Sequence, residues 1–455
     1  MKFVSTRGQA PAISFEDVLL SGPAPDGGLY MPESWPRLDF TRLKGKKLSY
    51  ADLAATVLAL FADRDWYEPI DRHARDVYAK FDTPNAVLLR ELGPHRWLLE
   101  LFHGPTLAFK DFALQLLVPL MNEALERRKT RALVLAATSG DTGAAAVAAL
   151  AGRPNIDLVI LHPKGRISDV QRRQMTTTTA SNIRNVAIEG TFDDAQALVK
   201  QIFADQAFAQ KHKLAAINSI NFVRIAAQAA YYLAASLALG NRPLTFSVPT
   251  GNFGDIFAAY VAKELGIPVH RLIVATNAND ILARAITTGT YARGTVHATL
   301  SPAMDIQVAS NFERLLYESH GRDAAAVRAL MQTFADTGSL TIKPEALSNI
   351  KKLFLADRVH EGETVATMKL FHRDANLTVD PHTAVGLTAT RKASETEDVV
   401  TLATAHPAKF PEAVEMATGT KPALPDRLKS LLTAAERYDT LPNDAAALRA
   451  YIAAR

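Results

Sequence analysis

The chain has 455 residues, 48% hydrophobic and 22% charged, which is enough for two or three globular domains because one core stops growing at roughly 250 to 300 residues. Its 51 Lys and Arg against 47 Asp and Glu give a net charge of +4 with both signs mixed along the chain, which disfavours nucleic-acid binding. The absence of cysteine excludes disulfides, cysteine-ligated zinc, iron–sulfur clusters and a thiol nucleophile, and we expect no metal site.

Residues 1–98 predict an N-terminal unit of mixed helices and strands. The turn-rich "SGPAPDGGLYMPESWP" is followed there by the amphipathic "YADLAATVLALFADRD". The first residues lack the apolar core of a secretory signal, and the most apolar long stretch, at 225–240, is shorter than the ~20 residues of a membrane span. We therefore expect a cytoplasmic protein that binds no membrane.

Lys110 lies in an apolar stretch, "LFHGPTLAFKDF" at 101–112. The large apolar side chains around it are Phe102, Leu107, Phe109 and Phe112. Such surroundings favour a neutral amine, a nucleophile that forms a Schiff base with an aldehyde such as pyridoxal phosphate. Many lysines beside aromatic residues only lay their methylene stems over apolar surface, so this stretch alone leaves both interpretations open.

From residue 131 on, short β-rich runs alternate with helical patterns. The runs are "RALVLAA" (131–137), "IDLVILHP" (156–163), "NVAIEG" (185–190), "LTFSVPT" (244–250), "RLIVATN" (271–277) and "EDVVTLATA" (397–405). This alternation predicts an α/β fold with two parallel-sheet domains, each covered by helices on both faces. The Ala-rich residues after Asp444 predict a terminal helix.

Two of these runs end in a glycine-rich turn before a helix, "ATSGDTGAAA" and "VPTGNFGDIF". At such a turn, main-chain N–H groups and the helix N-terminus together attract anions, although glycine also simply permits a tight connection. Neither turn has the Gly-Lys-Ser/Thr ending of a nucleotide triphosphate loop or the three-glycine dinucleotide spacing. We expect one turn to bind the phosphate of pyridoxal phosphate and the other the carboxylate of an amino acid.

Several stretches between about residues 100 and 410 together resemble one family. They are "LFHGPTLAFKDF", "ATSGDTGAAA", "NSINFVRIAAQ", "VPTGNFGDIFAAY", "ATNANDIL", "DPHTAVG" and "LATAHPAKF", in this order. The chain resembles the threonine synthases of bacteria and fungi, which are fold type II, tryptophan-synthase-β-like pyridoxal phosphate enzymes. The resemblance implies conversion of O-phospho-L-homoserine and water to L-threonine and phosphate, the last step of threonine biosynthesis, by a monomer or small homo-oligomer.

The resemblance also implies a division into domains. Residues 1–98 are the N-terminal unit, 99–130 and 216–455 the large cofactor-binding domain, and 131–215 a small mobile domain that carries the carboxylate-binding turn. We expect substrate binding to close the small domain, because water should enter only after phosphate has left.

By the same resemblance, Lys110 carries the Schiff base and moves protons on the substrate. The residues implied to hold the cofactor phosphate are Gly251, Asn252, Phe253, Gly254 and Asp255. Those implied to line the substrate carboxylate and the neighbouring face of the cofactor are Ser139, Gly140, Asp141 and Thr142. The hydroxyl of Thr404 is implied to meet the pyridine nitrogen, which makes the ring a mild electron sink that suits elimination and replacement.

Asp141 departs from the wider fold group, which often has asparagine there. An ionised Asp141 repels a carboxylate, so we expect main-chain N–H groups and the hydroxyls of Ser139 and Thr142 to bind it. The alternative interpretation of Asp141 is a helix N-cap. The leaving phosphate needs a third anion site, for which His103, Thr106 and Arg224 are candidates, and Asn277 is a candidate for contact with substrate or cofactor.

Three alternatives stay open. A serine or threonine dehydratase of the same fold group uses the same cofactor but needs no third anion site. A nucleotide-dependent ligase or kinase uses the two glycine turns for phosphates. The third is a catalytically inactive homologue that only binds a metabolite.

Overall fold

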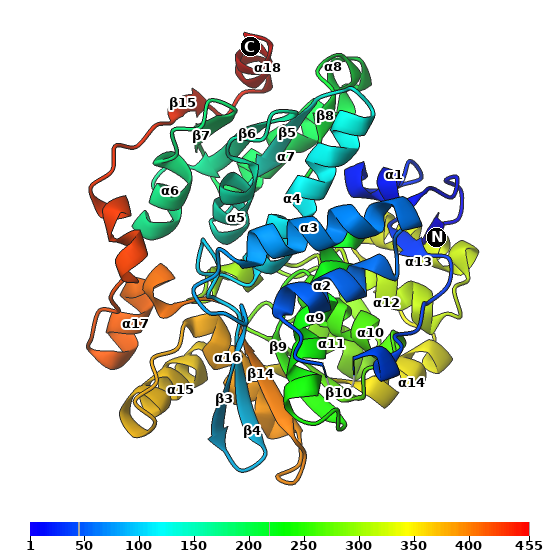
Figure 1. The fold of residues 1–455 in the computed structure, drawn as a ribbon, viewed down its shortest axis with the longest axis vertical. Helices are drawn as coiled ribbons and strands as arrows, with labels where there is room; N and C mark the ends of the chain where they lie inside the picture. Colours follow the sequence, from blue (N-terminus) through cyan, green and yellow to red (C-terminus); the bar gives the residue numbers. More distant parts are fainter. Residues whose placement is uncertain (44–45, 218, 455) are drawn as a thin grey trace. The chain divides into compact units, whose positions relative to one another are not determined.

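The structure is a computed structural model that describes residues 1–43, 46–217 and 219–454 (Figure 1). The chain forms two compact units. The first consists of Met1–Val18, Pro23–Ala113 and Ser219–Pro422, and the second of Leu19–Gly22, Leu114–Asn218 and Ala423–Arg455.

The first unit contains a six-stranded sheet. Its strands, in spatial order, are β13 (Phe354–Arg358), β10 (Val269–Thr276), β9 (Leu244–Pro249), β14 (Val399–Ala403), β4 (Arg96–Glu100) and β3 (Leu88–Gly93). All neighbours are parallel except β3 and β4, which pair antiparallel. The carboxyl ends of β9, β10, β14 and β4 therefore meet at one edge, where open α/β sheets bind ligands.

Helices cover both faces of this sheet. The ring of Phe246 in β9 lies 4.9 Å from that of Tyr232 in α9 (Phe222–Ala238). The next residue, Ser247, points to the other face and donates a 2.6 Å hydrogen bond to the carbonyl of Gly386 in α16 (Pro381–Ala389). The helices packed around these two are α10 (Gly254–Glu264), α15 (Glu361–Asp374) and α17 (Pro411–Thr418).

The N-terminal residues pack into the first unit. Helix α2 (Tyr50–Ala59) starts with a capping box between Ser49 and Asp52 and packs on α9, and the ring of Phe3 lies 5.5 Å from that of Phe222. The structure thus differs from the predicted separate unit at 1–98, because the apolar face of α2 is buried on α9.

The first unit also contains further helices, strands and 3-10 turns, wholly or in part. They are β1 (Phe3–Ser5), α1 (Phe15–Leu20), β2 (Tyr30–Pro32), α3 (Tyr67–Tyr78), α11 (Ile281–Thr288), β11 (Thr290–Ala292), α12 (Phe312–Ser319), α13 (Ala324–Thr337), β12 (Ser339–Thr341), α14 (Pro344–Leu353) and 3-10 turns at Phe40–Arg42, Arg64–Trp66, Pro302–Met304, Thr390–Lys392 and Pro407–Lys409.

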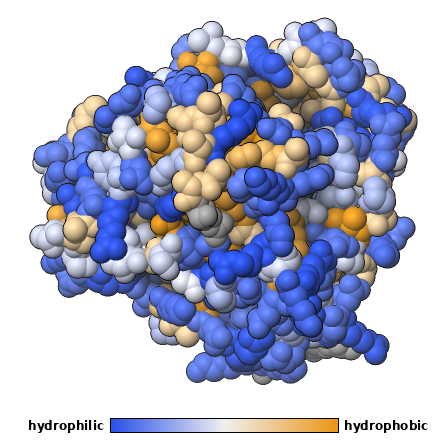
Figure 2. Space-filling model, turned by 90° about the horizontal axis from the view of Figure 1, so that it is seen from above, coloured by the Kyte–Doolittle hydropathy of each residue, from blue (hydrophilic) through white to orange (hydrophobic). Residues whose placement is uncertain are grey.

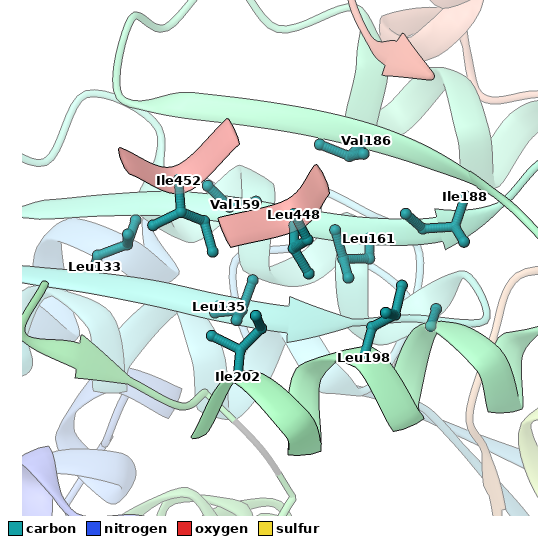
Figure 3. Close-up of a cluster of buried hydrophobic side chains, with 11 residues drawn as sticks. Leu133, Leu135, Val159, Leu161, Val186, Ile188, Leu198, Ile202, Leu448 and Ile452 are labelled. Atoms are coloured by element: carbon teal, nitrogen blue, oxygen red, sulfur yellow. The ribbon is translucent and has the colours of Figure 1, made fainter. Parts of the chain in front are cut away.

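The second unit contains a five-stranded, fully parallel sheet. Its order is β15 (Asp439–Pro442), β7 (Ile183–Glu189), β6 (Ile156–Pro163), β5 (Ala132–Ala137) and β8 (Leu214–Ala215). Alternate side chains of β5, β6 and β7 pack against α7 (Phe192–Ala204) and α18 (Ala445–Ala453), as Figure 3 shows. The opposite face meets α5 (Asp141–Leu150) and α6 (Asp169–Thr176), where Asn185 of β7 donates to the carbonyl of Met175 at 2.9 Å.

Besides α1, whose last residues Leu19 and Leu20 lie in this unit, three further helices belong wholly or partly to it. They are α4 (Lys110–Arg127), which begins in the first unit and continues into the second, α8 (Gln206–Lys211) and the 3-10 helix Asp426–Leu432.

The predicted fold class is confirmed: two parallel-rich sheets carry helices on both faces, and all six predicted strands are present. The domain boundaries differ at the C-terminus. Residues from Ala423 on were predicted in the large domain but lie in the second unit, because β15 pairs with β7 and Leu448 and Ile452 are buried in that core.

No helix among the described residues is long and apolar enough to cross a membrane. On the face drawn in Figure 2, hydrophilic residues cover most of the surface and apolar side chains gather only in small groups.

Candidate active site

Lys110 is the first residue of α4 and follows the end of a tight loop. In this loop Leu107 has a left-handed backbone with φ of 63°, and the carboxylate of Asp111 accepts hydrogen bonds from the N–H of Thr106 at 2.7 Å and from its hydroxyl at 2.8 Å. These contacts fix the start of the helix. The Lys110 side chain is half-buried, and its Nζ lies 4.6 Å from the centre of the Phe109 ring.

The aromatic residues predicted around Lys110 also make ring contacts of their own. Phe112 belongs to an aromatic cluster, with its ring 5.2 Å from that of Tyr50 and 5.7 Å from that of Tyr231. The ring of Phe102 lies 5.4 Å from that of His406. Phe109, one of the four predicted neighbours, has its ring next to the amine.

The end of β14 runs beside the Lys110 loop. The N–H of Phe109 donates to the carbonyl of Thr404 at 2.9 Å, Ala108 forms a β-bridge with Ala405, and the N–H of His406 donates to Leu107. Thr404, one of the predicted site residues, is thus brought next to the segment that carries Lys110.

The second glycine turn joins β9 to α10, as predicted. Phe253 caps α10 with a left-handed backbone, φ 62°. A Cβ on Gly251 would lie 2.7 Å from the carbonyl oxygen of Ala303, so only glycine fits against this wall. The turn therefore presents main chain at a helix N-terminus, which is an arrangement that binds phosphate.

Side chains of the turn are engaged in holding it. The Asn252 amide donates to the hydroxyl of Ser219 and accepts from the N–H of Ser310 at 2.6 Å, and its main-chain carbonyl accepts from the Asn311 side chain at 3.1 Å. Ser219 belongs to the motif "NSINFVRIAAQ", whose first residue, Asn218, lies outside the described residues. The side-chain amide of Asn252 is therefore engaged with protein groups, and its part in phosphate binding stays a prediction.

The side chain of Asp255, the last residue of the predicted phosphate loop, is engaged with protein groups. Its buried carboxylate accepts hydrogen bonds from the hydroxyls of Tyr231 at 2.5 Å and Tyr232 at 2.8 Å, and leaves only its main-chain N–H for a phosphate. Burial raises the pKa of Asp255 to about 6, although both tyrosines and the charge of Lys110 lower it.

Arg224 is 4% exposed and lies in the first turn of α9, which Asn221 caps. Its Nη1 has no hydrogen-bond partner among the described residues, and burial lowers the pKa of the guanidinium to about 10. An unpartnered buried guanidinium nitrogen is costly unless it binds an anion, so this is the strongest candidate for a further anion site.

The other two candidates for that site have partners. The ring Nε2–H of His103 donates to Glu100 at 2.9 Å, and the Thr106 hydroxyl is used by Asp111. Burial alone would raise the pKa of Glu100, but the hydrogen bonds from His103 and Arg90 outweigh it and the pKa is lowered.

Asn277 is completely buried and supports the wall behind Gly251. Its amide nitrogen donates to Asp305 at 2.8 Å and to the hydroxyl of Ser301 at 3.0 Å, and its oxygen accepts from the N–H of Asn279 at 2.9 Å. Its amide is thus occupied by protein groups, and a contact with substrate or cofactor stays a prediction.

The first glycine turn lies in the second unit. The hydroxyl of Thr138 accepts from the N–H groups of Gly140 at 3.0 Å and Gly143 at 2.9 Å, while Ser139 and Thr142 are half-buried. Gly140 has φ of 141°, which L-residues rarely adopt, and it is the N-cap of α5. The alternative reading of Asp141 as the N-cap is therefore wrong: Asp141 is the first helical residue and accepts from the Gln171 amide at 2.9 Å.

Several residues of the site have no distinct sequence signal. Thr138 and Gln171 shape the first turn, and Tyr231 and Tyr232 hold Asp255. In the sequence, Tyr231 and Tyr232 appear only as two residues with a hydroxyl inside the apolar stretch 225–240. The buried pair Asp380 and His382 comes from the quoted motif "DPHTAVG", but the motif alone gave it no role.

Comparisons with known proteins find similarity to one family along nearly the whole chain. The family described as "Pyridoxal-phosphate dependent enzyme" matches residues 82–356, "Threonine synthase N terminus" matches 2–70 and "Threonine synthase, C-terminal" matches 383–452. The chain is 48% identical to threonine synthase from Pseudomonas aeruginosa, covering 99% of this chain and 98% of the relative.

Solved structures give the same result. The crystal structure of PLP-bound threonine synthase from Brucella melitensis superposes with a TM-score of 0.96 at 47% identity, covering 99% of this chain and 98% of the other. Threonine synthase from yeast gives 0.93 at 36% identity over 99% and 98%. The chain belongs to the threonine synthase family of pyridoxal phosphate-dependent enzymes.

Proposed function

We propose that the chain is a threonine synthase, a pyridoxal phosphate-dependent lyase that converts O-phospho-L-homoserine and water to L-threonine and phosphate. The observation that carries this reading beyond family membership is the unpartnered, buried Nη1 of Arg224, in the same unit as Lys110 and the Gly251 turn. A phosphorylated substrate needs such a further anion site, whereas a dehydratase acting on serine or threonine does not.

The residues present fit pyridoxal phosphate. Lys110 supplies a primary amine, and the turn from Gly251 to Gly254 offers main-chain N–H groups at the start of α10 against a wall that excludes any Cβ. When bound, the cofactor supplies an electron sink that stabilises negative charge on the substrate carbons. Thr404 is the proposed neighbour of its ring nitrogen, on the basis of the pairing between Thr404 and Phe109.

The protein residues bind, orient and move protons around the substrate. Lys110 Nζ takes and returns protons at the substrate carbons. Arg224 holds the phosphate group as it leaves, so that its charge is neutralised in a buried site. Ser139, Gly140 and Thr142 stay the proposed carboxylate-binding residues, with Asp141 held in place by Gln171.

The alternatives are less well supported. The fold and the full-length similarity to threonine synthases disfavour a nucleotide-dependent ligase or kinase. The substrates of a serine or threonine dehydratase have no phosphate group, so that function gives the buried Arg224 no anion to bind. An inactive homologue is disfavoured because Lys110 and both glycine turns are present.

Release of phosphate from O-phospho-L-homoserine, with L-threonine formed in equal amount, tests the proposal directly. The Lys110→Ala variant is expected to lose the visible absorption of bound cofactor and all turnover. Ammonia release from serine or threonine, with no phosphate release from O-phospho-L-homoserine, would instead identify a dehydratase.

Other parts of the proposal follow from the reaction. The substrate is a small molecule, and the cytoplasm is the proposed location because the reaction is a biosynthetic step. A monomer or small homo-oligomer and the mobility of residues 131–215 stay predictions.

A further inference from the structure

Asp141 places a carboxylate in the turn that is proposed to bind the carboxylate of the substrate. It is the first residue of α5 and is buried. Because the N-terminus of a helix attracts negative charge, Asp141 and a substrate carboxylate compete for the same main-chain N–H groups. If a substrate carboxylate is to bind there, another group must hold the side chain of Asp141 away from these N–H groups.

Gln171 of α6 makes this contact. Its side-chain nitrogen, Nε2, donates to Oδ1 of Asp141 at 2.9 Å, and its side-chain oxygen, Oε1, accepts from the hydroxyl of Ser168 at 3.1 Å. Ser168 also caps α6, since its hydroxyl oxygen accepts from the main-chain N–H of Gln171 at 3.3 Å. The hydroxyl proton of Ser168 therefore goes to Oε1, which fixes the end of the Gln171 amide that faces Asp141 as its donor end.

The same face of α6 shapes the main chain of the turn. A Cβ on Gly140 would lie 2.5 Å from Cδ and Nε2 of Gln171, and a Cβ on Gly143 would lie 2.6 Å from the sulfur of Met175. Gln171 and Met175 are four residues apart and therefore lie on one side of the helix. The amide of Gln171 thus lies against Gly140 while it donates to Asp141, so it contacts two consecutive residues of the turn.

We propose that Gln171 is a positioning residue for the substrate carboxylate: its amide holds the carboxylate of Asp141 against α6 and leaves the main-chain N–H groups of the turn to the substrate. This inference rests on the proposed function, in which this turn binds the substrate carboxylate. It also states what must stand opposite Asp141. A neutral donor attracts the carboxylate of Asp141, whereas a second carboxylate would repel it toward the turn.

The binding of two amines to the full-length holoenzyme tests the proposal without using turnover. L-Threonine, the proposed product, has a carboxylate, and L-threoninol has an alcohol in its place. Gln171→Glu keeps the size of the side chain but replaces the donor with a second carboxylate. We expect the dissociation constant for L-threonine to rise at least about tenfold and that for L-threoninol to change less than about twofold. The change in visible absorption of the bound cofactor measures both.

An exchange of the two side chains tests whether the hydrogen bond itself is responsible. In the double variant Asp141→Asn with Gln171→Glu, the donor and the acceptor change places, and the net charge of the pair equals that of the wild type. The amide introduced at position 141 can donate to the carboxylate introduced at position 171. The dissociation constant for L-threonine should therefore return to within about threefold of the wild-type value.

Gln201→Glu is the matched control. It makes the same substitution in the same unit, at an exposed position of α7, so it adds the same charge at the surface. Both dissociation constants should equal those of the wild type. If Gln171→Glu does not fold, Gln171→Met removes the donor without adding a charge, and it should also weaken the binding of L-threonine more than that of L-threoninol.

The outcomes separate the two proposals. A wild-type protein that never acquires the visible absorption of bound pyridoxal phosphate, or that releases no phosphate from O-phospho-L-homoserine, contradicts the proposed function. If the wild-type holoenzyme binds L-threonine and Gln171→Glu binds it equally tightly, or weakens the binding of both amines alike, only the role of Gln171 is contradicted. An exchanged pair that binds L-threonine no better than Gln171→Glu contradicts that role too.

Discussion

Arg224 is a buried cation with one nitrogen, Nη1, that has no acceptor among the residues that the structure describes. In the ligand-free protein the missing hydrogen bond lowers stability, because the remaining contacts of the guanidinium offset only part of the cost of removing it from water. Arg314 is also buried and its Nε likewise has no hydrogen-bond partner among the described residues, but its other two nitrogens donate to the carbonyls of Ile220 at 2.6 Å and Tyr30 at 3.1 Å and to the side chain of Asn311. The printed hydrogen bonds of Arg314 join three parts of the protein, whereas Arg224 is the arginine that we propose binds a ligand.

We predict that Arg224→Met leaves the ligand-free protein as stable as the wild type or stabilises it by about 1 to 3 kcal/mol, since an apolar chain replaces an unsatisfied charge. Phosphate release from O-phospho-L-homoserine should fall by at least about 100-fold, or ~2.7 kcal/mol. Urea unfolding without ligands and a phosphate-release assay measure the two effects.

Arg314→Met is the comparison variant. It should lower the free energy of unfolding by about 3 to 5 kcal/mol, because three acceptors lose their donors. Equal destabilisation by both substitutions would contradict the assignment of Arg224 as a ligand-binding residue.

Glu100 gives a pH-dependent prediction. Its pKa is lowered in the folded protein by hydrogen bonds from His103 and Arg90 that outweigh burial, so its contribution to stability is fully present above the unfolded value near 4.5 and is lost as pH falls below it. Glu100→Gln should cost about 1 to 3 kcal/mol at pH 7 and progressively less below pH 4.5. Urea unfolding between pH 3.5 and 7 checks this, and a cost independent of pH would contradict it.

At the scale of elements, the turn between β9 and α10 packs against residues 301–305, which form the wall behind Gly251. Hydrogen bonds from other elements hold this wall in place. The N–H of Ala303 in this wall donates to Nε2 of His382 at 3.2 Å, and the other ring nitrogen, Nδ1, donates to Asp380 at 2.8 Å. Asn277 holds the same segment through Ser301 and Asp305. This explains the role of the motif "DPHTAVG": it holds the surface on which the glycine turn rests.

Gly251→Ala should therefore displace the turn and leave the wall in place. We expect the dissociation constant for pyridoxal phosphate to rise at least about tenfold, or ~1.4 kcal/mol, because the added Cβ meets a fixed carbonyl oxygen. An absorbance titration of the cofactor-free protein with pyridoxal phosphate measures the change.

Gly362→Ala in α15 is the matched control. No atom lies within 4 Å of its added Cβ, so cofactor affinity should be unchanged and the helix stabilised by about 0.5 to 1 kcal/mol. If Gly251→Ala binds the cofactor as tightly as Gly362→Ala, the wall has yielded and the explanation fails.

Local sequence patterns predicted the elements well where a strand lies inside a sheet. The runs at 156–163 and 244–250 are apolar on both faces, and they form the central strands β6 and β9. β15 was not predicted, because its four residues have no apolar run and its pairing partner, β7, lies some 250 residues earlier. Long-range pairing of a short edge strand leaves no local signal.

The sequence motifs predicted which residues belong to the site. They did not predict which side chains contact one another. The glycine turn and Lys110 could be recognised from composition and resemblance. The side chain of Asp255 points away from the glycine turn and toward Tyr231 and Tyr232. This orientation depends on how α9 and α10 pack together, which no motif encodes. Likewise, nothing near Asp141 in sequence indicates that Gln171, 30 residues on, occupies its carboxylate.

For the whole molecule, the chain builds its second unit from three separated stretches. The last of them, Ala423–Arg455, contributes Leu448 and Ile452 to the core beside α7 (Figure 3). The stability of this unit therefore depends on residues that a domain boundary drawn from the sequence assigned to the other unit.

Leu448→Ala should destabilise the second unit by about 2 to 5 kcal/mol, since it leaves a cavity in a closely packed core. Hydrogen exchange should increase in β5, β6 and β7 more than in β9, β10 and β14. Leu432→Ala, at a side chain that is 51% exposed, should change stability by no more than about 0.5 kcal/mol. Equal exchange in both variants would show that the C-terminal helix contributes little to this core.

The position of β15 also affects how the protein is made. β8 ends at Ala215 and β15 begins at Asp439, so at roughly 5 to 20 residues per second a ribosome needs about 10 to 45 s to add the missing strand. During that time the nascent chain carries an open β7 edge and an uncovered apolar face, both of which favour aggregation. Cells that overproduce this protein should therefore benefit from chaperones that shield the emerging sheet.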